Sequence, residues 1–489
     1  MSFVERHGLW SQEQKEAASR LRKIVEDQKL EVIRLSFPDQ HGILRGKTLV
    51  ASEALASLES GCSITTTMLA KDTSHRTVFP VFTAGGGFGM KEMEGAADVL
   101  MVADPTTFRV LPWTPGTGWL MCDLHFADGR PVPFATRNLY RGVLDRLTQR
   151  GYDFVAGLEV EFHIFKLEDT KVLPEHAGQP GTPPDVSLLS HGYQYLTEQR
   201  YDQMEPVLEI IRRDVLALGL PLRSIEVEFG PSQCEFTFAP RSGIEPADNM
   251  VLFRSAVKQA LRRAGYHATF MCRPPFPHIM SSGWHLHQSL VDLATGGNAC
   301  VRESPAPGSG RADARHTLSD AGAHWLAGLL AHAEGMTALC TPTVNGFGRF
   351  RPNALAPQSM IWGQDNRGAM LRVIGGPGDH ATRIENRIGE PAANPYLYMA
   401  AQIHAGLDGL TRGLEPPPAC ETPYAADHPK IPDTLGHALG CLRADTALIA
   451  GLGADVVHHF CRIKQQEIDR HADAKDKTDF DRREYFSRI

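Results

Sequence analysis

The sequence of 489 residues has little of what marks secreted, membrane-bound or nucleic-acid-binding proteins. Its nine cysteines are dispersed and form no Cys-x-x-Cys pair, so they indicate neither a disulfide framework nor a zinc–thiolate site. The formal net charge of −7 provides no basic surface for nucleic acid. No apolar run approaches the roughly 20 residues of a membrane span, and the first residues lack the apolar core of a signal peptide. We therefore expect a cytoplasmic protein that binds neither nucleic acid nor membranes.

The remaining pattern indicates two domains that mix helices and strands. Ser11 and Gln14 form a capping-box pattern ahead of a predicted helix, and residues 30–50 alternate like a hairpin. The glycine-rich residues 84–90 follow no convincing strand and open no helix, which favours a loop over a dinucleotide-binding motif. A capped helix begins at Thr136, and we place the boundary between domains 1–133 and 134–489 at Pro133.

Helices are expected to alternate with strands in the second domain. Because proline is favoured in the first turn of a helix, Glu205-Pro206 predicts a helix start, and Gly219 predicts the end of that helix. The residues from Asp445 onward have a charged, helical pattern.

Five glutamates and one histidine fall within short strand-like segments of this second domain. They are Glu159 and Glu161 in GLEVEF, Glu228 and Glu235 in EVEFGPSQCE, His285 in GWHLHQS and Glu385 in RIENR. Side chains two residues apart on a strand share a face, so the polar residues oppose an apolar face. Buried carboxylates need a cation, and hard divalent ions such as Mg²⁺ or Mn²⁺ suit them. The neighbouring arginines indicate phosphate beside these ions.

Each of these segments has a simpler interpretation when it is taken alone. Glutamates at alternate positions of a strand usually form a solvated face, and two histidines so spaced are commonly structural. An Arg-x-Glu-x-Arg pattern is also compatible with surface ion pairs that contribute little stability. Only the joint occurrence of the segments favours a metal and phosphate site.

In this order, the segments resemble the signature blocks of the glutamine synthetase family, in its glutamate–amine ligase branch. The blocks are GLEVEF, EFGPSQCE, GWHLHQS, NRGAMLR, RIENR and PAANPYLYMAAQIHAGLDGL, and the resemblance covers roughly residues 32–409. It implies an α+β fold, with a small N-terminal β-grasp-like domain and a catalytic domain whose curved antiparallel sheet is flanked by helices. It also implies a homo-oligomer, a dodecamer of two stacked hexameric rings whose active sites are shared between neighbouring subunits.

The resemblance also implies a role for individual residues. The first metal would be held by Glu161, Glu228 and Glu235, and the second, which clamps the ATP phosphates, by Glu159, His285 and Glu385. The catalytic set around the transferred phosphate would be Arg367, Arg387 and Glu385. The nucleotide would be bound by His287, Ser289, Arg372 and Arg383, and glutamate by Arg349, Arg387 and Ser281.

The implied reaction joins L-glutamate to an amine with two or more Mg²⁺ or Mn²⁺ ions and ATP. ATP phosphorylates the γ-carboxylate, and an amine then displaces phosphate from the γ-glutamyl phosphate. The enzyme would thus be an ADP-forming ligase that makes a C–N bond. Metals and arginines would neutralise the transferred phosphoryl group electrostatically.

The sequence departs from the family pattern where ammonium would bind. Six residues after Arg349, where ammonia-using members carry a glutamate, this chain has Leu355. Ser60 stands where a second acid, an aspartate, is expected. The Asn-Gly pair of the glutamate-binding loop is replaced by Met280-Ser281.

These departures favour a hydrophobic, aniline-like amine as the acceptor. Ammonium and aliphatic amines have pKa values near that of lysine, so they arrive charged and need a carboxylate, whereas an arylamine is neutral at pH 7. Leu355 and Ser60 are therefore candidates for the amine site. The alternatives are a polyamine or alkylamine ligase in which another acid such as Asp72 serves the amine, an ammonia-using glutamine synthetase, and an inactive homologue with a structural or regulatory role.

Overall fold

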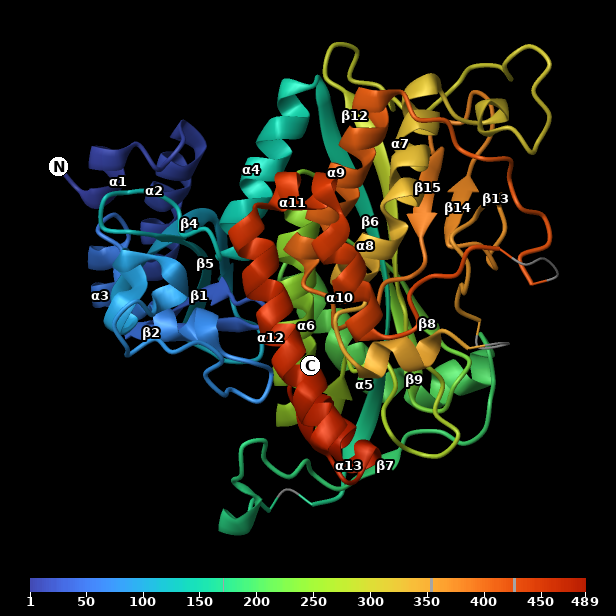
Figure 1. The fold of residues 1–489 in the computed structure, drawn as a ribbon. Coiled ribbons are helices and arrows are strands. Elements are labelled where there is room, and N and C mark those ends of the chain that lie inside the picture. Colours follow the sequence, from blue (N-terminus) through green and yellow to red (C-terminus); the bar gives the residue numbers. More distant parts are fainter. Residues whose placement is uncertain (170, 352–354, 425–427) are drawn as a thin grey trace. The chain divides into compact units, whose positions relative to one another are not determined.

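The computed structural model describes residues 1–169, 171–351, 355–424 and 428–489 (Figure 1). Two units follow from the contacts within the chain. Unit 1 contains Met1–Leu139 and Arg212–Leu220, and unit 2 contains Tyr140–Ile211 and Pro221–Ile489. Among the described residues, no helix combines the length and the apolar character needed to cross a membrane.

Unit 1 is built on a five-stranded sheet in the order β2-β1-β5-β4-β3. Its central strands β1 and β5 are parallel, whereas the other neighbouring pairs are antiparallel, an arrangement that agrees with the predicted β-grasp-like domain. The elements are α1 (Phe3–His7), α2 (Gln12–Asp27), β1 (Val32–Pro38), β2 (Leu44–Val50), α3 (Ala51–Ser57), β3 (Cys62–Thr65), β4 (Asp98–Val110) and β5 (Thr117–His125).

Two local predictions for unit 1 are confirmed. The Ser11 hydroxyl accepts from the Gln14 amide, and the Gln14 side chain accepts from the Ser11 amide, so the capping box does open α2. Strands β1 and β2 form the expected hairpin, in which Val32 pairs with Val50 and Pro38 with Leu44. The glycine-rich stretch contains a short 3₁₀ turn at Gly87–Gly89, and the irregular 3₁₀ segment Lys91–Ala96 follows it.

Unit 2 is built on a larger, curved sheet in the order β13-β14-β15-β12-β6-β9-β8. Strands β7, β10 and β11 also pair with the long strand β6, and only β13 and β14 are a parallel pair among the described strands of this sheet. The strands are β6 (Tyr152–Leu167), β7 (Val186–Leu188), β8 (Leu222–Val227), β9 (Gln233–Phe238), β10 (Arg241–Ser242), β11 (Tyr266–Thr269), β12 (Trp284–Asp292), β13 (Trp362–Gln364), β14 (Leu371–Ile374) and β15 (Arg383–Asn386).

Helices flank this sheet, and α6 packs directly on β6, β10 and β11 (Figure 1). Helix α9 is buried along most of its length against α6, α7, α8 and α11. The helices are α4 (Thr136–Gln149), α5 (Glu198–Ala217), α6 (Glu245–Arg263), α7 (Asp320–Ala331), α8 (Ala333–Cys340), α9 (Pro395–Arg412), α10 (Leu435–Ala444), α11 (Thr446–Leu452), α12 (Ala454–Asp473) and α13 (Lys477–Asp481). Both α4 and α5 are divided between the two units.

The predicted start of one helix is wrong. Helix α5 begins at Glu198 rather than after Pro206, and Pro206 lies inside it. The Thr197 carbonyl accepts from the amides of Arg200 and Tyr201, so the first turn forms well before the proline. Buried apolar contacts of residues such as Met204 and Leu208 extend the helix on both sides of Pro206 and offset its missing N–H.

Candidate active site

Pairing among four strands brings the predicted metal ligands together. Across the β6–β12 pair, His285 lies opposite Glu159, and across the β12–β15 pair, His287 lies opposite Glu385. On the other side of β6, Glu161 lies opposite Glu235 of β9. Glu228 follows directly after the end of β8. The apolar neighbours Leu158, Val160 and Phe162 are buried on the opposite face of β6, as the alternation predicts.

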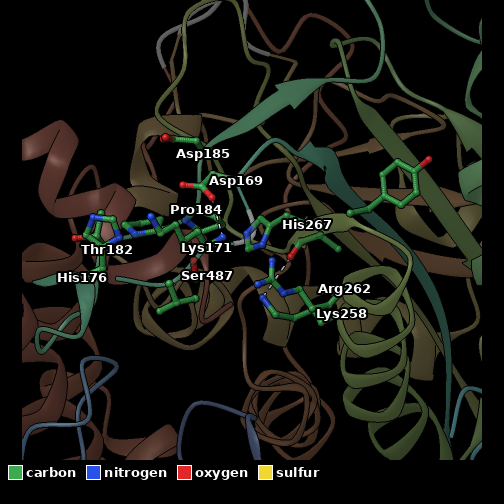
Figure 2. A pocket seen from close by; sticks show the side chains of 14 residues that line it. Asp169, Lys171, His176, Thr182, Pro184, Asp185, Lys258, Arg262, His267 and Ser487 are labelled. Carbon is green, nitrogen blue, oxygen red and sulfur yellow. Dashed lines mark hydrogen bonds between the residues drawn. The ribbon is translucent and has the colours of Figure 1, made fainter. Parts of the chain in front are cut away.

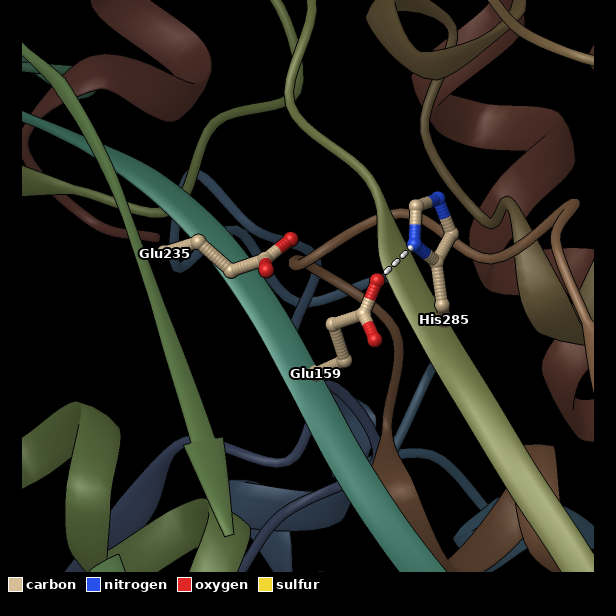
Figure 3. A group of neighbouring side chains, drawn as sticks. All are labelled: Glu159, Glu235 and His285. Carbon is tan, nitrogen blue, oxygen red and sulfur yellow. Dashed lines mark hydrogen bonds and ion pairs between the residues drawn. The ribbon is translucent and has the colours of Figure 1, made fainter. Parts of the chain in front are cut away.

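Two groups of these side chains are close enough to hold a metal ion. Ligand atoms of Glu159, Glu235 and His285 all lie within 4.8 Å of one another, and so do those of Glu159, His287 and Glu385. Figure 3 shows the carboxylates of Glu159 and Glu235 and the His285 ring turned toward one another from three strands. The grouping differs from the predicted one because Glu159 belongs to both groups and His287, predicted to contact nucleotide, joins the second.

Hydrogen bonds from two histidines hold the Glu159 carboxylate in this position. His285 Nδ1 lies 2.8 Å from Glu159 Oε1, and His287 Nε2 lies 3.0 Å from Oε2. Arg383 Nε donates to His287 Nδ1 over 3.1 Å, which assigns the proton of a neutral His287 ring to Nε2. The two rings therefore orient Glu159 at the centre of the site.

The carboxylates of the site differ sharply in pKa. Burial and repulsion from Glu159 and Glu161 raise the pKa of Glu235 to about 11. Burial and repulsion from Glu228 raise the pKa of Glu161 to about 8. Burial and the Glu226 charge raise the pKa of Glu228 to about 6. For Glu159, burial acts in the same direction, but hydrogen bonds from His285 and His287 outweigh it and lower the pKa.

This donor set suits a hard divalent cation. Carboxylate oxygens and imidazole nitrogens are ligands for Mg²⁺ and Mn²⁺, and the mutual repulsion that raises the carboxylate pKa values is what a cation would relieve. Glu161 and Glu228 are outside the two close groups of described residues, although their charges interact with those of the groups.

A second cluster combines Glu385 with two arginines. Glu385 is fully buried, and its carboxylate accepts from Arg372 Nη1 over 3.0 Å and from Arg387 Nη1. Burial raises its pKa, but His285 and Arg387 outweigh burial and lower it, so Glu385 is ionised. Arg387 Nε is buried without a hydrogen-bond partner among the described residues. An unsatisfied guanidinium donor at this place is suited to an anionic oxygen.

The other predicted contact residues occupy different environments. Arg349 is buried, and its guanidinium donates to the carbonyls of Gly389 and Arg387. Ser281 accepts from Arg273 Nη1 over 3.2 Å through its hydroxyl. Ser289 is half-buried on β12, and Arg367 is exposed in the turn between β13 and β14. Arg367 lines a cavity of about 420 Å³ with Asp365, Cys420 and Glu421.

The sequence pattern missed Gln233, which hydrogen-bonds to the segment before β12. Its Nε2 group donates to Glu161 Oε2 over 3.1 Å, to the Ser281 carbonyl over 3.2 Å and to the Ser282 hydroxyl over 3.1 Å. Gln233 therefore ties a candidate metal ligand to the segment before β12. The only sequence signal for it is its place inside the EFGPSQCE block, because a single amide has no diagnostic spacing.

The candidate amine-site residues lie far apart in the sequence and differ in solvent exposure. Leu355 is 60% exposed and has a positive φ of 59°. The residues between Arg351 and Leu355 lie outside the described part. Ser60 is exposed after α3 in unit 1, and Asp72 is buried in unit 1, where it accepts from the Arg76 amide. Their roles toward the amine stay predictions.

A glycine-to-alanine substitution tests how tightly the site is packed. A Cβ atom at Gly283 would lie 2.5 Å from Arg349 Nη2 and 3.1 Å from His285 Nε2. We expect Gly283→Ala to displace both side chains and to lower kcat/KM at least tenfold, with a loss of about 1–3 kcal/mol of unfolding free energy. Gly142→Ala is the matched control, since its Cβ on α4 would meet nothing within 4 Å. Equal activity of the two variants would show that the site tolerates a Cβ atom at position 283.

Comparison with known proteins places this site in a family. The model of the glutamine synthetase catalytic domain matches residues 134–483. A γ-glutamylanilide synthase from an Acinetobacter species is 40% identical, over 100% of this chain and 99% of the relative. The chain therefore belongs to the glutamine synthetase family, whose members use ATP and divalent metals. The predicted enzyme class, a ligase, is confirmed.

A second γ-glutamylamine synthetase and a solved structure are also similar to this chain. The γ-glutamylethanolamide synthetase GlnA4 of Streptomyces coelicolor is 33% identical over 96% of this chain and 95% of its own length. A solved structure of GmaS in complex with ADP has a TM-score of 0.75 and 28% identity, covering 94% of this chain and 97% of that one. The fold predicted from the signature blocks is thus confirmed.

Proposed function

We propose that this enzyme joins the γ-carboxylate of L-glutamate to a neutral aromatic amine, with conversion of ATP to ADP and phosphate. The observation that carries the proposal is the 40% identity, over the whole chain, to a γ-glutamylanilide synthase. The apolar, exposed Leu355 at the position of an ammonium-binding glutamate supports it from this chain's own sequence. The best rival is an alkylamine or polyamine acceptor.

Two divalent ions, Mg²⁺ or Mn²⁺, would be held by glutamates and a histidine of β6, β9, β12 and β15, together with Glu228, which follows β8. The ligands that we propose are Glu159, Glu161, Glu228, Glu235, His285 and Glu385, with His287 beside them. When bound, these ions supply charge neutralisation for the transferred phosphoryl group. Arg387 and Arg367 would contact that group, and the unsatisfied Arg387 Nε–H provides a donor for it.

The chain's own residues would orient the two anionic substrates. Arg372 donates to Glu385 and Arg383 donates to His287, so both guanidinium groups lie beside the proposed metal ligands, where they would bind the nucleotide. Ser281 and Arg349 would position glutamate, with Gln233 holding the loop that carries Ser281. The γ-carboxylate oxygen attacks the γ-phosphorus of ATP, ADP leaves, and γ-glutamyl phosphate results.

In the second half of the reaction, the amine nitrogen attacks the γ-carbonyl carbon. A C–N bond forms, the C–O bond to phosphate breaks, and the proton released by the nitrogen passes to solvent. An arylamine reaches the site with its lone pair free, so no carboxylate has to remove a proton before attack. An apolar side chain such as Leu355 then favours the ring by burial rather than by charge.

The oligomeric state is a further part of the proposal. We propose a homo-dodecamer of two stacked hexameric rings, which the family membership supports. Light scattering on the purified protein should give about twelve times the 53.7 kDa of one chain. A monomeric mass with full activity would contradict this arrangement.

The Leu355→Glu variant tests the amine specificity. We expect kcat/KM for aniline to fall about tenfold or more, because the apolar contact worth about 1.5–3 kcal/mol is lost, while turnover with ammonium or isopropylamine rises. Leu293→Glu is the control, since Leu293 is also exposed and follows β12 outside the site. An unchanged amine profile in Leu355→Glu would remove Leu355 from the amine site.

A further inference from the structure

A separate cavity of about 410 Å³ lies in unit 2, away from the carboxylate site (Figure 2). Its wall is formed by residues of the segment 169–185, of α6 and of β11, together with Ser487. Tyr266 of β11 pairs with Lys166, which is five residues beyond Glu161 on β6 and therefore about 17 Å from it. None of the residues assigned to metal, nucleotide, glutamate or amine lines this cavity. The proposed reaction therefore gives it no role.

Three cationic side chains line the cavity. Lys258 and Arg262 are four positions apart on α6, so they lie on the same face of that helix, and Lys171 joins them from the segment 169–185. Figure 2 shows Lys258 and Arg262 near His267. Within the described part of the chain, no carboxylate lies within ion-pair distance of Lys258 or Arg262. Because like charges at this spacing repel each other, an anion beside them would be stabilising.

The two acidic residues of the wall do not balance all of this positive charge. The Asp185 carboxylate lies 3.4 Å from Arg482 Nη2, so its charge is already paired. The Asp169 carboxylate accepts from the Lys171 amide over 2.7 Å. Three cations then share the cavity with the single carboxylate of Asp169, which leaves two positive charges for a ligand to neutralise.

Hydrogen bonds to main-chain oxygens hold the Lys258 ammonium group in place. Its Nζ donates to the main-chain oxygen of Ile489 over 2.7 Å and to the Ala268 carbonyl over 3.4 Å. An ammonium group has three N–H donors, so one of them remains for a ligand. Burial and the Arg254 charge lower the pKa of Lys258 to about 7. An anion in the cavity would stabilise the charged form of this group.

His267 lines the same cavity as a neutral side chain. Its Nε2 lies 2.9 Å from the Phe486 carbonyl, which can only accept, so Nε2 carries the proton of the neutral ring. Burial and the charges of Lys258 and Arg262 lower the pKa of His267 to about 3. Both cations therefore act on the same point of the wall, and the positive potential there comes from them rather than from the imidazole.

We infer that this cavity binds a compact dianion, a phosphate or a dicarboxylate, between Lys258 and Arg262. A guanidinium group offers two parallel N–H donors to an oxyanion, and the free N–H of Lys258 adds a third. Two negative charges match the two positive charges that the wall leaves unbalanced. The inference goes beyond the proposed function, since it adds an anion site that is separate from the ATP site and does not depend on the acceptor amine.

Calorimetric titration of the full-length enzyme with inorganic phosphate and with succinate tests this inference. We expect Arg262→Ala to weaken binding of at least one of these anions tenfold or more, because a charge-assisted pair of hydrogen bonds is lost. Lys258→Gln should have a similar effect, since it removes the charge and keeps an N–H donor. The kcat/KM of Arg262→Ala should equal that of wild type, because Arg262 is exposed and lies outside the active site.

Arg263→Ala is the matched control. Arg263 is also exposed in the last turn of α6, but it does not line the cavity, so its variant should keep the wild-type affinity for both anions. A loss confined to phosphate identifies a tetrahedral oxyanion as the ligand, and a loss confined to succinate identifies a dicarboxylate.

Three results would overturn the inference. The first is a wild type that binds neither anion. The second is equal affinity of wild type, Arg262→Ala and Lys258→Gln, which would place all anion binding at the active site. The third is an equal loss in Arg262→Ala and Arg263→Ala, because the effect would then come from the charge of the helix end and not from the cavity.

Discussion

Replacement of Glu159 by glutamine will lower kcat/KM with glutamate and amine by about 10³-fold while the protein stays folded. Glu159 belongs to both groups of potential metal ligands and accepts hydrogen bonds from His285 and His287. A neutral amide removes the negative charge that both groups share. Metal-assisted phosphoryl transfer depends on several kcal/mol of charge stabilisation, and each 1.36 kcal/mol corresponds to tenfold in rate.

The control for this variant is Glu168→Gln. Glu168 follows the far end of the same strand, where it is exposed and accepts from the Ser187 hydroxyl. We expect wild-type activity and wild-type Mn²⁺ affinity for Glu168→Gln, and weak Mn²⁺ binding for Glu159→Gln in calorimetric titrations. Glu159→Gln with full activity and unchanged Mn²⁺ affinity would show that the metal centre lies elsewhere.

The affinity of the enzyme for Mn²⁺ will rise about 10- to 100-fold per pH unit between pH 6.5 and 7.5. Glu235 and Glu161, with pKa values of about 11 and about 8, are protonated there, and a bound divalent ion needs them ionised. Each proton released on binding contributes a factor of up to ten per pH unit. Calorimetry in two buffers of different ionisation enthalpy counts these protons directly.

The stability of the metal-free protein changes with pH in the opposite direction to the Mn²⁺ affinity. Both carboxylates have folded-state pKa values above the ordinary value of 4.5, so the stability that they contribute without metal is lost as pH rises through about 8 and toward 11. Mn²⁺ should therefore raise the midpoint of thermal unfolding more at pH 8.5 than at pH 6.5. Taking the difference with and without Mn²⁺ cancels other groups that titrate here, such as Lys258 and Glu390. The Glu235→Gln variant should show a weaker pH dependence of Mn²⁺ affinity than wild type. A Mn²⁺ affinity of wild type that does not change with pH would contradict the assignment of Glu235 and Glu161 as metal ligands.

Features that depend only on residues close together in the chain could be predicted from the sequence. The alternation of Glu159 and Glu161 with buried Leu158, Val160 and Phe162 predicted a polar face on one strand, and β6 has it. The Ser11 capping box likewise predicted the start of α2, because capping depends only on residues within one turn.

Other features depend on contacts between distant segments and could not be predicted in this way. The register that sets His285 opposite Glu159 depends on how β12 aligns with β6, which periodicity alone does not specify. Pro206 predicted a helix start, but packing of α5 on both sides of the proline overrides that local preference. The rings of Tyr195 and Phe229 lie 6.4 Å apart although these residues are more than thirty positions apart in the chain, so no motif contains both.

The most direct test of the central claim is a competition between aniline and ¹⁵N-labelled ammonium in one reaction with ATP, Mg²⁺ and L-glutamate. Mass spectrometry of the products gives the ratio of the two kcat/KM values without separate assays. We predict that γ-glutamylanilide greatly exceeds labelled glutamine even when ammonium is in hundredfold excess. A product mixture dominated by labelled glutamine would show that the site binds ammonium and would contradict the aromatic-acceptor account.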